Sequence, residues 1–173
     1  MELLKYSIIF ALVAWAGLTK TRAQANQVST FGELQAAYLY NFAKYIKWPN
    51  SSNAFTIGVF GESAALDELK AVLAGKKVMM GEIKVKQINS MAEVAECQII
   101  YLPFTNSRSI NKIQTEIAGK PILLVTEEDL TRRGAAISFV VENDRLRFKL
   151  NKKSLEEALL VASEGLLKLA IVL

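Results

Sequence analysis

Three short apolar segments, separated by stretches with helical patterns, constrain the fold of this chain more than any other feature. Residues 54–60 (AFTIGVF), 98–102 (QIIYL) and 121–125 (PILLV) are rich in β-branched and apolar side chains, which is typical of strands buried on both faces of a parallel sheet. Helical patterns at residues 64–73 and 109–118 alternate with these segments. Because parallel strands need right-handed crossovers, helices should cover both faces of the sheet. The pattern predicts an α/β fold.

The other segments complete a predicted three-layer sandwich. Residues 83–88 (IKVKQI) alternate apolar and polar side chains and therefore predict a half-exposed or edge strand, followed by a short helix at residues 90–96. Residues 136–141 and 145–150 flank a polar three-residue turn, which predicts an antiparallel hairpin. We therefore expect a mostly parallel central sheet with a C-terminal antiparallel hairpin and helices on both faces.

The last segment is predicted to be one helix that runs nearly to the C-terminus. Ser154 and Glu157 have the spacing of a capping box. Leucines follow at positions 159, 160, 166, 167 and 169, and Gly165 is the single glycine or proline among them.

The first 25 residues have the features of a signal peptide. Lys5 precedes an apolar run at residues 7–18 (SIIFALVAWAGL), and residues 23–25 (AQA) match a cleavage site. The run is shorter than the roughly 20 residues that span a bilayer. A retained membrane anchor is the alternative, because two basic residues follow the run and could act as a stop. We predict a signal peptide over residues 1–25.

The mature chain, residues 26–173, is predicted to be one periplasmic domain of nearly neutral charge. No repeat, low-complexity tract or flexible linker divides it. Removal of the signal peptide takes away three basic residues and one acidic residue, which lowers the formal charge from +4 to +2. A nucleic-acid-binding protein would be expected to show a clustered basic surface. Nucleic acid is therefore not expected as a partner.

The chemistry that the chain can carry is limited by two residue types. It contains no histidine and one cysteine, Cys97, which excludes histidine-dependent triads, histidine metal sites and thiolate zinc sites. Cys97 leads into a predicted buried strand, where we expect it to be a small core residue. No glycine-rich phosphate loop is present. The sequence predicts no catalytic residues, no metal and no cofactor, and so a protein that is not an enzyme.

A candidate ligand site follows from the predicted topology. In an open α/β sheet, ligands bind beyond the carboxyl ends of the parallel strands. In this chain those ends supply Glu62, Ser63, Thr105, Asn106, Ser107, Arg108, Thr126 and Glu127. Ser63 and Ser107 are expected close to helix N-termini, whose free N–H groups suit an anion, and Arg108 could add a bidentate guanidinium. Simple N-capping and a solvated loop are the alternative for each residue.

A candidate partner-binding surface follows from the arginines near the end of the chain. Side chains alternate along a strand, so Arg145 and Arg147 should share one face and Leu146 and Phe148 the other. Arg133 belongs to a second basic group just before the hairpin. We predict that these three arginines bind a partner, and ordinary solvation is the alternative.

The first helix of the mature chain contains an aromatic-rich segment. Thr30 and Glu33 have capping-box spacing, and Trp48 before Pro49 is expected to end the helix. At 100° per residue, one broad apolar arc contains Leu34, Ala37, Tyr38, Asn41, Phe42 and Tyr45, extended on one side by Leu39 and Ile46. We predict that this arc is core. Because a buried amide needs a hydrogen-bond partner, Asn41 should tie down a neighbouring backbone segment, and Asn41, Trp48 and Pro49 are assigned structural roles.

Six motifs together resemble one known family. Residues 36–49 (AAYLYNFAKYIKWP), 55–63 (FTIGVFGES), 76–88 (KKVMMGEIKVKQI), 97–103 (CQIIYLP), 119–127 (GKPILLVTE) and 132–151 (RRGAAISFVVENDRLRFKLN) occur in the same order as in the YfiR family of small periplasmic proteins. The resemblance covers nearly all of the mature chain, and its first motif is specific.

The resemblance implies a non-catalytic regulator. Its expected partner is the periplasmic sensor region of a membrane-bound diguanylate cyclase, which it would repress, lowering cyclic di-GMP and biofilm formation. The resemblance also implies a homodimer. A histidine kinase is the alternative membrane partner, and a small-ligand-binding module that serves such a sensor is the alternative function. Some relatives have several cysteines and form disulfides, whereas Cys97 is alone here, so redox control of stability is not expected.

Overall fold

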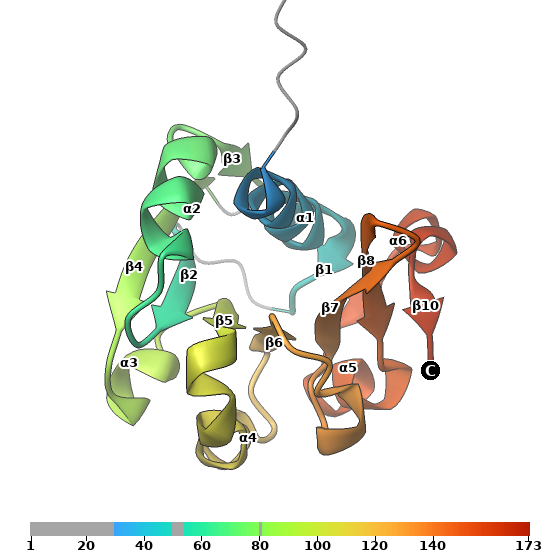
Figure 1. The fold of residues 1–173 in the computed structure, drawn as a ribbon. Coiled ribbons are helices and arrows are strands. Elements are labelled where there is room, and N and C mark those ends of the chain that lie inside the picture. The colour runs from blue at the N-terminus through green and yellow to red at the C-terminus, as the bar shows by residue number, and fades with distance from the viewer. Residues whose placement is uncertain (1–29, 50–53, 80) are drawn as a thin grey trace, which may run out of the picture.

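The computed structural model describes residues 30–49, 54–79 and 81–173 and shows a central sheet with helices on both faces (Figure 1). The strands of the described sheet are β2 (Phe55–Phe60), β3 (Lys77–Val78), β4 (Gly81–Ile88), β5 (Ile99–Leu102), β6 (Leu123–Thr126), β7 (Ile137–Glu142), β8 (Arg145–Leu150) and β10 (Ile171–Val172). A separate antiparallel pair consists of β1 (Ile46–Lys47) and β9 (Val161–Ala162). The helices are α1 (Phe31–Tyr45), α2 (Ala65–Leu73), α3 (Met91–Val94), α4 (Ile110–Ile117), α5 (Lys152–Glu157) and α6 (Glu164–Leu169), with 3₁₀ turns η1 (Phe104–Ser109) and η2 (Thr131–Arg133).

The sheet has the order β10-β8-β7-β6-β5-β2-β4-β3. In the parallel part, β4-β2-β5-β6-β7, the chain forms β2 first and adds β4 on one side of it. It then adds β5, β6 and β7 in turn on the other side. This is the doubly wound order 2-1-3-4-5. β8 then pairs with β7 in antiparallel fashion. The predicted three-layer fold with a mostly parallel sheet and a hairpin is confirmed.

Two buried clusters hold the three layers together. The first joins α1 and α2 to one face of the sheet, and the second joins α3 and α4 to the opposite face. Figure 1 shows α1 and α2 above the sheet and α3 and α4 below it. The apolar strand segments are buried on both sides for this reason, because each strand contributes alternate side chains to the two clusters.

The buried face of α1 differs from the predicted apolar arc. The helix buries Gln35, Ala36, Leu39, Phe42 and Ala43. Two members of the predicted arc, Leu34 and Tyr45, are exposed to 38% and 44%. α1 packs against α2 as well as the sheet, and small side chains allow two helices to approach closely. The predicted arc omitted Ala36 and Ala43, whereas its extension, Leu39 and Ile46, is buried as expected.

The end of α1 is fastened by Trp48. The helix ends at Tyr45, three residues earlier than predicted, because Ile46 and Lys47 turn into β1 and pair with β9. The indole Nε1 of Trp48 donates a hydrogen bond to the carbonyl oxygen of Ala43 at 3.2 Å. Its ring also packs edge-on against Phe55, with ring centroids 5.1 Å apart. Trp48 thus links the end of the helix to the start of β2, and the exposed Pro49 follows it.

The prediction of one C-terminal helix is wrong. The segment divides into α5, β9, α6 and β10, because Leu159 adopts a left-handed conformation with φ +57° that no α-helix accommodates. Asn151, not Ser154, caps α5 by accepting a hydrogen bond from the Ser154 N–H at 3.1 Å. Ser163 caps α6 in the same way.

The predicted signal peptide lies outside the described residues. Within the described ranges, no helix is long and apolar enough to cross a lipid bilayer. The description begins at Thr30, which forms the predicted capping box with Glu33 at the start of α1.

Cys97 lies in the second buried cluster and should be chemically inert. The residue is 2% exposed, and its Sγ donates to the carbonyl oxygen of Glu93 at 3.3 Å. Burial raises the pKa of the thiol to about 11, and the reactive species is the thiolate. At neutral pH we expect maleimide or disulfide reagents to label the native protein at least ~100-fold more slowly than the urea-unfolded protein.

The same burial makes stability fall at alkaline pH. The unfolded thiol ionises near its ordinary value, about 8.5, whereas the folded thiol keeps its proton up to about pH 11. Stability is therefore lost as the pH rises from the lower value towards the higher one. Fast labelling of the folded protein at pH 7 would contradict both expectations.

Candidate functional site

The topology creates a crevice between two neighbouring strands, β2 and β5. The chain leaves β2 for α2 on one face of the sheet and leaves β5 for α4 on the opposite face. Loops that diverge in this way open the switch-point crevice at which doubly wound proteins bind ligands. A cleft of about 880 Å³ lies here, and we call it the switch-point cleft. It is lined by Glu62, Ser63, Ala64, Ala65, Pro103, Phe104, Thr105, Asn106 and Glu127.

The wall that follows β2 begins with a tight glycine turn. Gly61 has φ +76°, and a Cβ at this position would lie 2.5 Å from Nδ2 of Asn106. A glycine is thus required for the Asn106 side chain to lie against the backbone here. Ser63 then accepts a hydrogen bond on Oγ from the Ala65 N–H at 3.1 Å, at the start of α2.

The wall that follows β5 presents an aromatic ring that is fixed at its backbone. Phe104 is 64% exposed. Its N–H donates to Oε2 of Glu127 at 2.8 Å, and its carbonyl accepts from the Ser107 hydroxyl at 2.8 Å. Both backbone groups of Phe104 are therefore engaged, while the side chain stays at the surface of the switch-point cleft.

A buried polar network supports the loop that carries Glu127. The hydroxyl oxygens of Thr126 and Ser138 lie 2.7 Å apart, and neither residue is exposed. Thr126 donates to the carbonyl of Glu128 at 2.7 Å, and Ser138 accepts from the Leu130 N–H at 3.1 Å. Satisfied buried networks rigidify the backbone around them. The sequence placed Thr126 at a strand end, but the network was missed because its partner Ser138 lies inside an apolar strand segment.

The three predicted ligand residues occupy different positions. Ser63 lines the switch-point cleft. Ser107 is buried, and its hydroxyl bonds Phe104. Arg108 is exposed on η1 and lies outside the set of lining residues. Glu62 and Glu127, which the strand ends also supplied, do line the cleft.

The predicted partner-binding arginines form two separate groups. Arg145 and Arg147 lie on the face of β8 opposite Leu146 and Phe148, as predicted, and the two apolar residues are buried. Arg147 is 3.8 Å from Glu142 of β7, which pairs with Arg145 in the hairpin register.

Arg133 lies near the other end of this hairpin. Its Nη2 donates to Oδ1 of Asn111 at 3.3 Å, and it precedes the first residue of β7. The six-residue strand β7 separates the two groups by about 17 Å at 3.4 Å per residue.

Lys149 is the third cation on the outer face of β8, and it is neutralised locally. Its Nζ lies 2.7 Å from Oδ2 of Asp129. Partial burial acts to raise the pKa of Asp129, but hydrogen bonds from Lys149 and Thr131 outweigh it and leave that pKa lowered. The outer end of the hairpin, with Arg145 and Arg147, is therefore the more available cationic surface.

Asn41 lies beside a second, smaller pocket. This pocket of about 310 Å³ lies between α1 and α6, and its lining includes Tyr38, Asn41, Tyr45 and Leu169. The predicted hydrogen bond from Asn41 to a neighbouring backbone segment is not seen among the described residues. Asn41 is half-buried rather than in the core, so its amide can be solvated.

The model of a family described as YfiR/HmsC-like matches residues 32–171 of the chain. No curated protein matches it. Solved structures with a similar fold include the following two. An ABC domain in complex with L-Trp from Streptococcus pneumonia is 16% identical with a TM-score of 0.56, over 79% of this chain and 59% of that one. A conserved domain protein from Vibrio cholerae O1 biovar El Tor is 13% identical with a TM-score of 0.56, over 83% of this chain and 60% of that one. This chain thus spans about three fifths of each, and such low identities show the fold alone.

Proposed function

Because the chain belongs to the YfiR/HmsC-like family, we propose that it is a non-catalytic periplasmic regulator. It represses a membrane-bound signalling enzyme of the diguanylate cyclase type by binding that enzyme's periplasmic sensor region. The observation that carries this proposal is the family match over residues 32–171, which includes nearly all of the described sheet and helices. The absence of histidine from the sequence and the predicted signal peptide agree with it.

The outer end of the β7–β8 hairpin is the surface that we assign to the partner. β6 pairs with β7 only as far as Ser138, so the rest of the hairpin extends beyond the parallel strands. Val141 is 57% exposed there, on the face of the hairpin opposite Arg145 and Arg147, because it pairs with Leu146. A repressor must bind the inactive state of its target more tightly than the active state. A projecting hairpin end with two arginines on one face and an exposed valine on the other is suited to such a contact, because arginine is enriched at interface hot spots.

Deletion of the gene tests the regulator directly. Loss of a repressor should raise cellular cyclic di-GMP, which is measured by mass spectrometry of nucleotide extracts, and the gene supplied in trans should restore the original level. An unchanged level would overturn the cyclase proposal. A changed phosphorylation state of a histidine kinase in the same strain would then identify the other type of membrane partner.

Charge reversal on the hairpin tests the assigned surface. The double variant Arg145→Glu, Arg147→Glu should weaken repression, and cyclic di-GMP should rise towards the deletion level, because a desolvated interface charge of the wrong sign costs several kcal/mol. Arg133→Glu, which reverses one arginine at the far end of the hairpin, is the charge-matched control for the single variants Arg145→Glu and Arg147→Glu. Immunoblotting verifies equal protein levels. Full repression by the double variant would show that the hairpin end is not part of the interface. An equal loss of repression in Arg133→Glu would show that the interface extends along the hairpin.

We propose as a second function a small-ligand-binding module that serves a membrane sensor such as a histidine kinase. The switch-point cleft favours this function, and the similar ABC domain from Streptococcus pneumonia is in complex with L-Trp. In this proposal Ser63 contacts the ligand, Ser107 positions Phe104, and Arg108 lies on the adjoining turn. The homodimer implied by the resemblance stays a prediction that sedimentation equilibrium would test.

A further inference from the structure

We infer that the switch-point cleft takes a small organic dication of the diamine class. The inference rests on the second proposed function, that this cleft is a ligand site. It replaces the anion that the strand-end serines and Arg108 suggested, and it follows from the charges, hydrogen bonds and spacing of the lining residues.

The charge of the lining is the first argument. Two glutamates, Glu62 and Glu127, are among the lining residues, and no lysine or arginine is. Glu62 follows β2 and Glu127 follows β6, so the two side chains come from different loops on either side of β5. An anionic ligand would meet two like charges here with no cation to balance them, whereas an ammonium group would meet two opposite charges.

Two backbone N–H groups at the start of α2 already donate hydrogen bonds to Ser63. A free helix N-terminus attracts anions through its unpaired N–H groups. Here the Ala65 N–H donates to Oγ of Ser63 at 3.1 Å, and the Leu66 N–H donates to the Ser63 carbonyl at 3.2 Å. Because Ser63 accepts hydrogen bonds from these two amides, neither is free to bind an anion.

The Glu127 carboxylate is oriented by a backbone N–H and can still accept further hydrogen bonds. Its Oε2 accepts the N–H of Phe104 at 2.8 Å, and no other hydrogen bond to this carboxylate occurs among the described residues. A carboxylate has about four lone-pair sites. One contact therefore fixes the group at the cleft and leaves Oε1 able to accept from an ammonium.

The spacing and the apolar lining select a ligand with two charges. β2 and β6 are each neighbours of β5, so two strand spacings, about 10 Å, separate the origins of the two carboxylates. Apolar groups of Pro103, Phe104 and Ala65 line the cleft as well. A chain of four or five methylenes with an ammonium at each end would place its charges at the glutamates and its carbons on these groups. The exposed ring of Phe104 adds a cation–π surface.

Titration calorimetry at low salt tests the inference with chemically matched ligands. The probes are 1,4-diaminobutane, 1,5-diaminopentane, the monoamine 1-aminobutane and the dianion glutarate. We expect the diamines to bind most tightly, the monoamine ~10-fold or more weakly, and glutarate not at all. Glu62→Gln and Glu127→Gln should each weaken diamine binding by ~10-fold or more, because each removes one charge-assisted hydrogen bond. Glu164→Gln on α6 removes an equal charge outside the cleft and should change nothing.

The outcomes separate the inference from the functions on which it builds. Glutarate binding in preference to the diamines would overturn the cationic class and leave the cleft as a ligand site. Binding by none of the four ligands would also overturn the diamine assignment. Diamine binding that all three glutamine variants preserve would show non-specific attraction and place the ligand elsewhere. Glu127→Gln retains an oxygen for the Phe104 N–H, so an unchanged melting temperature verifies its fold. Cyclic di-GMP in the deletion strain tests the regulator independently.

Discussion

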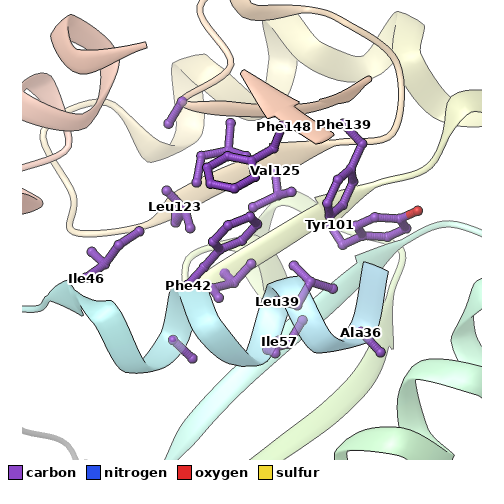
Figure 2. Close-up of a cluster of buried hydrophobic side chains, with 14 of the residues drawn as sticks. Ala36, Leu39, Phe42, Ile46, Ile57, Tyr101, Leu123, Val125, Phe139 and Phe148 are labelled. Atoms are coloured by element: carbon purple, nitrogen blue, oxygen red, sulfur yellow. The ribbon is translucent and has the colours of Figure 1, made fainter. Parts of the chain in front are cut away.

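Replacing Phe42 by alanine is expected to lower the free energy of unfolding by about 3–5 kcal/mol, the usual cost of removing a buried phenylalanine. The side chain is fully buried between α1 and the sheet (Figure 2). Its ring lies 5.0 Å from that of Phe148 in an edge-on arrangement and 6.1 Å from that of Phe139. The substitution would leave a cavity that these aromatic rings cannot fill, because Phe148 and Phe139 are held in the paired strands β7 and β8.

Urea unfolding followed by circular dichroism measures this loss. A typical domain has only 5–15 kcal/mol of stability, so the midpoint of unfolding should fall sharply. Tyr45→Ala is the control, because Tyr45 belongs to the same helix and is 44% exposed. It should cost less than about 1 kcal/mol. Equal losses for the two variants would contradict the assignment of Phe42, rather than Tyr45, to the core.

Gly58→Ala is expected to destabilise the protein by about 1–3 kcal/mol, the range for overpacking a filled core. Gly58 lies in the central strand β2, and an added Cβ would meet Sγ of Cys97 at 2.7 Å and Cδ1 of Ile88 at 2.8 Å. Both neighbours are buried, so neither side chain can move into solvent. The site excludes a methyl group on packing grounds rather than through an unusual backbone conformation.

Gly165→Ala is the matched control for this substitution. Gly165 lies within α6 with nothing within 4 Å of the added Cβ, so alanine should stabilise the helix by about 0.5–1 kcal/mol. A second test uses the double variant Gly58→Ala, Cys97→Ala, which removes the closest clashing atom and should recover part of the stability relative to the sum of the single changes. Additive losses would show that the clash with Cys97 is not the cause.

The strands were predictable because their signals are local. The apolar runs at β2, β5 and β6 need no knowledge of tertiary structure, and the polar turn of the hairpin is equally explicit, with Asn143 and Asp144 both at positive φ. The buried face of α1 was not predictable in the same way, because it depends on where α2 packs. The C-terminal helix was mispredicted because Leu159 is a strong helix former. In the structure it takes the left-handed position of a Schellman motif at the end of α5, in which the Leu160 N–H donates to the carbonyl of Leu155 and the Leu159 N–H to that of Glu156, each at 2.9 Å.

The position of the candidate site at the sheet edge could be predicted from the sequence, but the charge of its lining could not. The rule for strand ends placed Ser63, Glu62 and Glu127 at the same edge of the sheet, and all three line the switch-point cleft. The rule does not say which way a long side chain points, so Arg108 was assigned to a cleft whose lining excludes it. Phe104 was missed because an aromatic residue after a strand is usually core. Its exposure depends on η1, whose path no local pattern indicated.

The pairing of β1 with β9 determines when α1 can pack stably during folding. Ile46 pairs with Ala162, more than a hundred residues later in the chain, and the Ser163 N–H donates to the carbonyl of Tyr45 at 2.9 Å. The Tyr38 hydroxyl likewise donates to the carbonyl of Leu146 at 3.2 Å. A chain that becomes available for folding from its N-terminus would therefore expose the apolar face of α1 until these late segments follow. Contacts of such sequence separation slow folding, so α1 is the segment whose apolar face should stay exposed longest during folding.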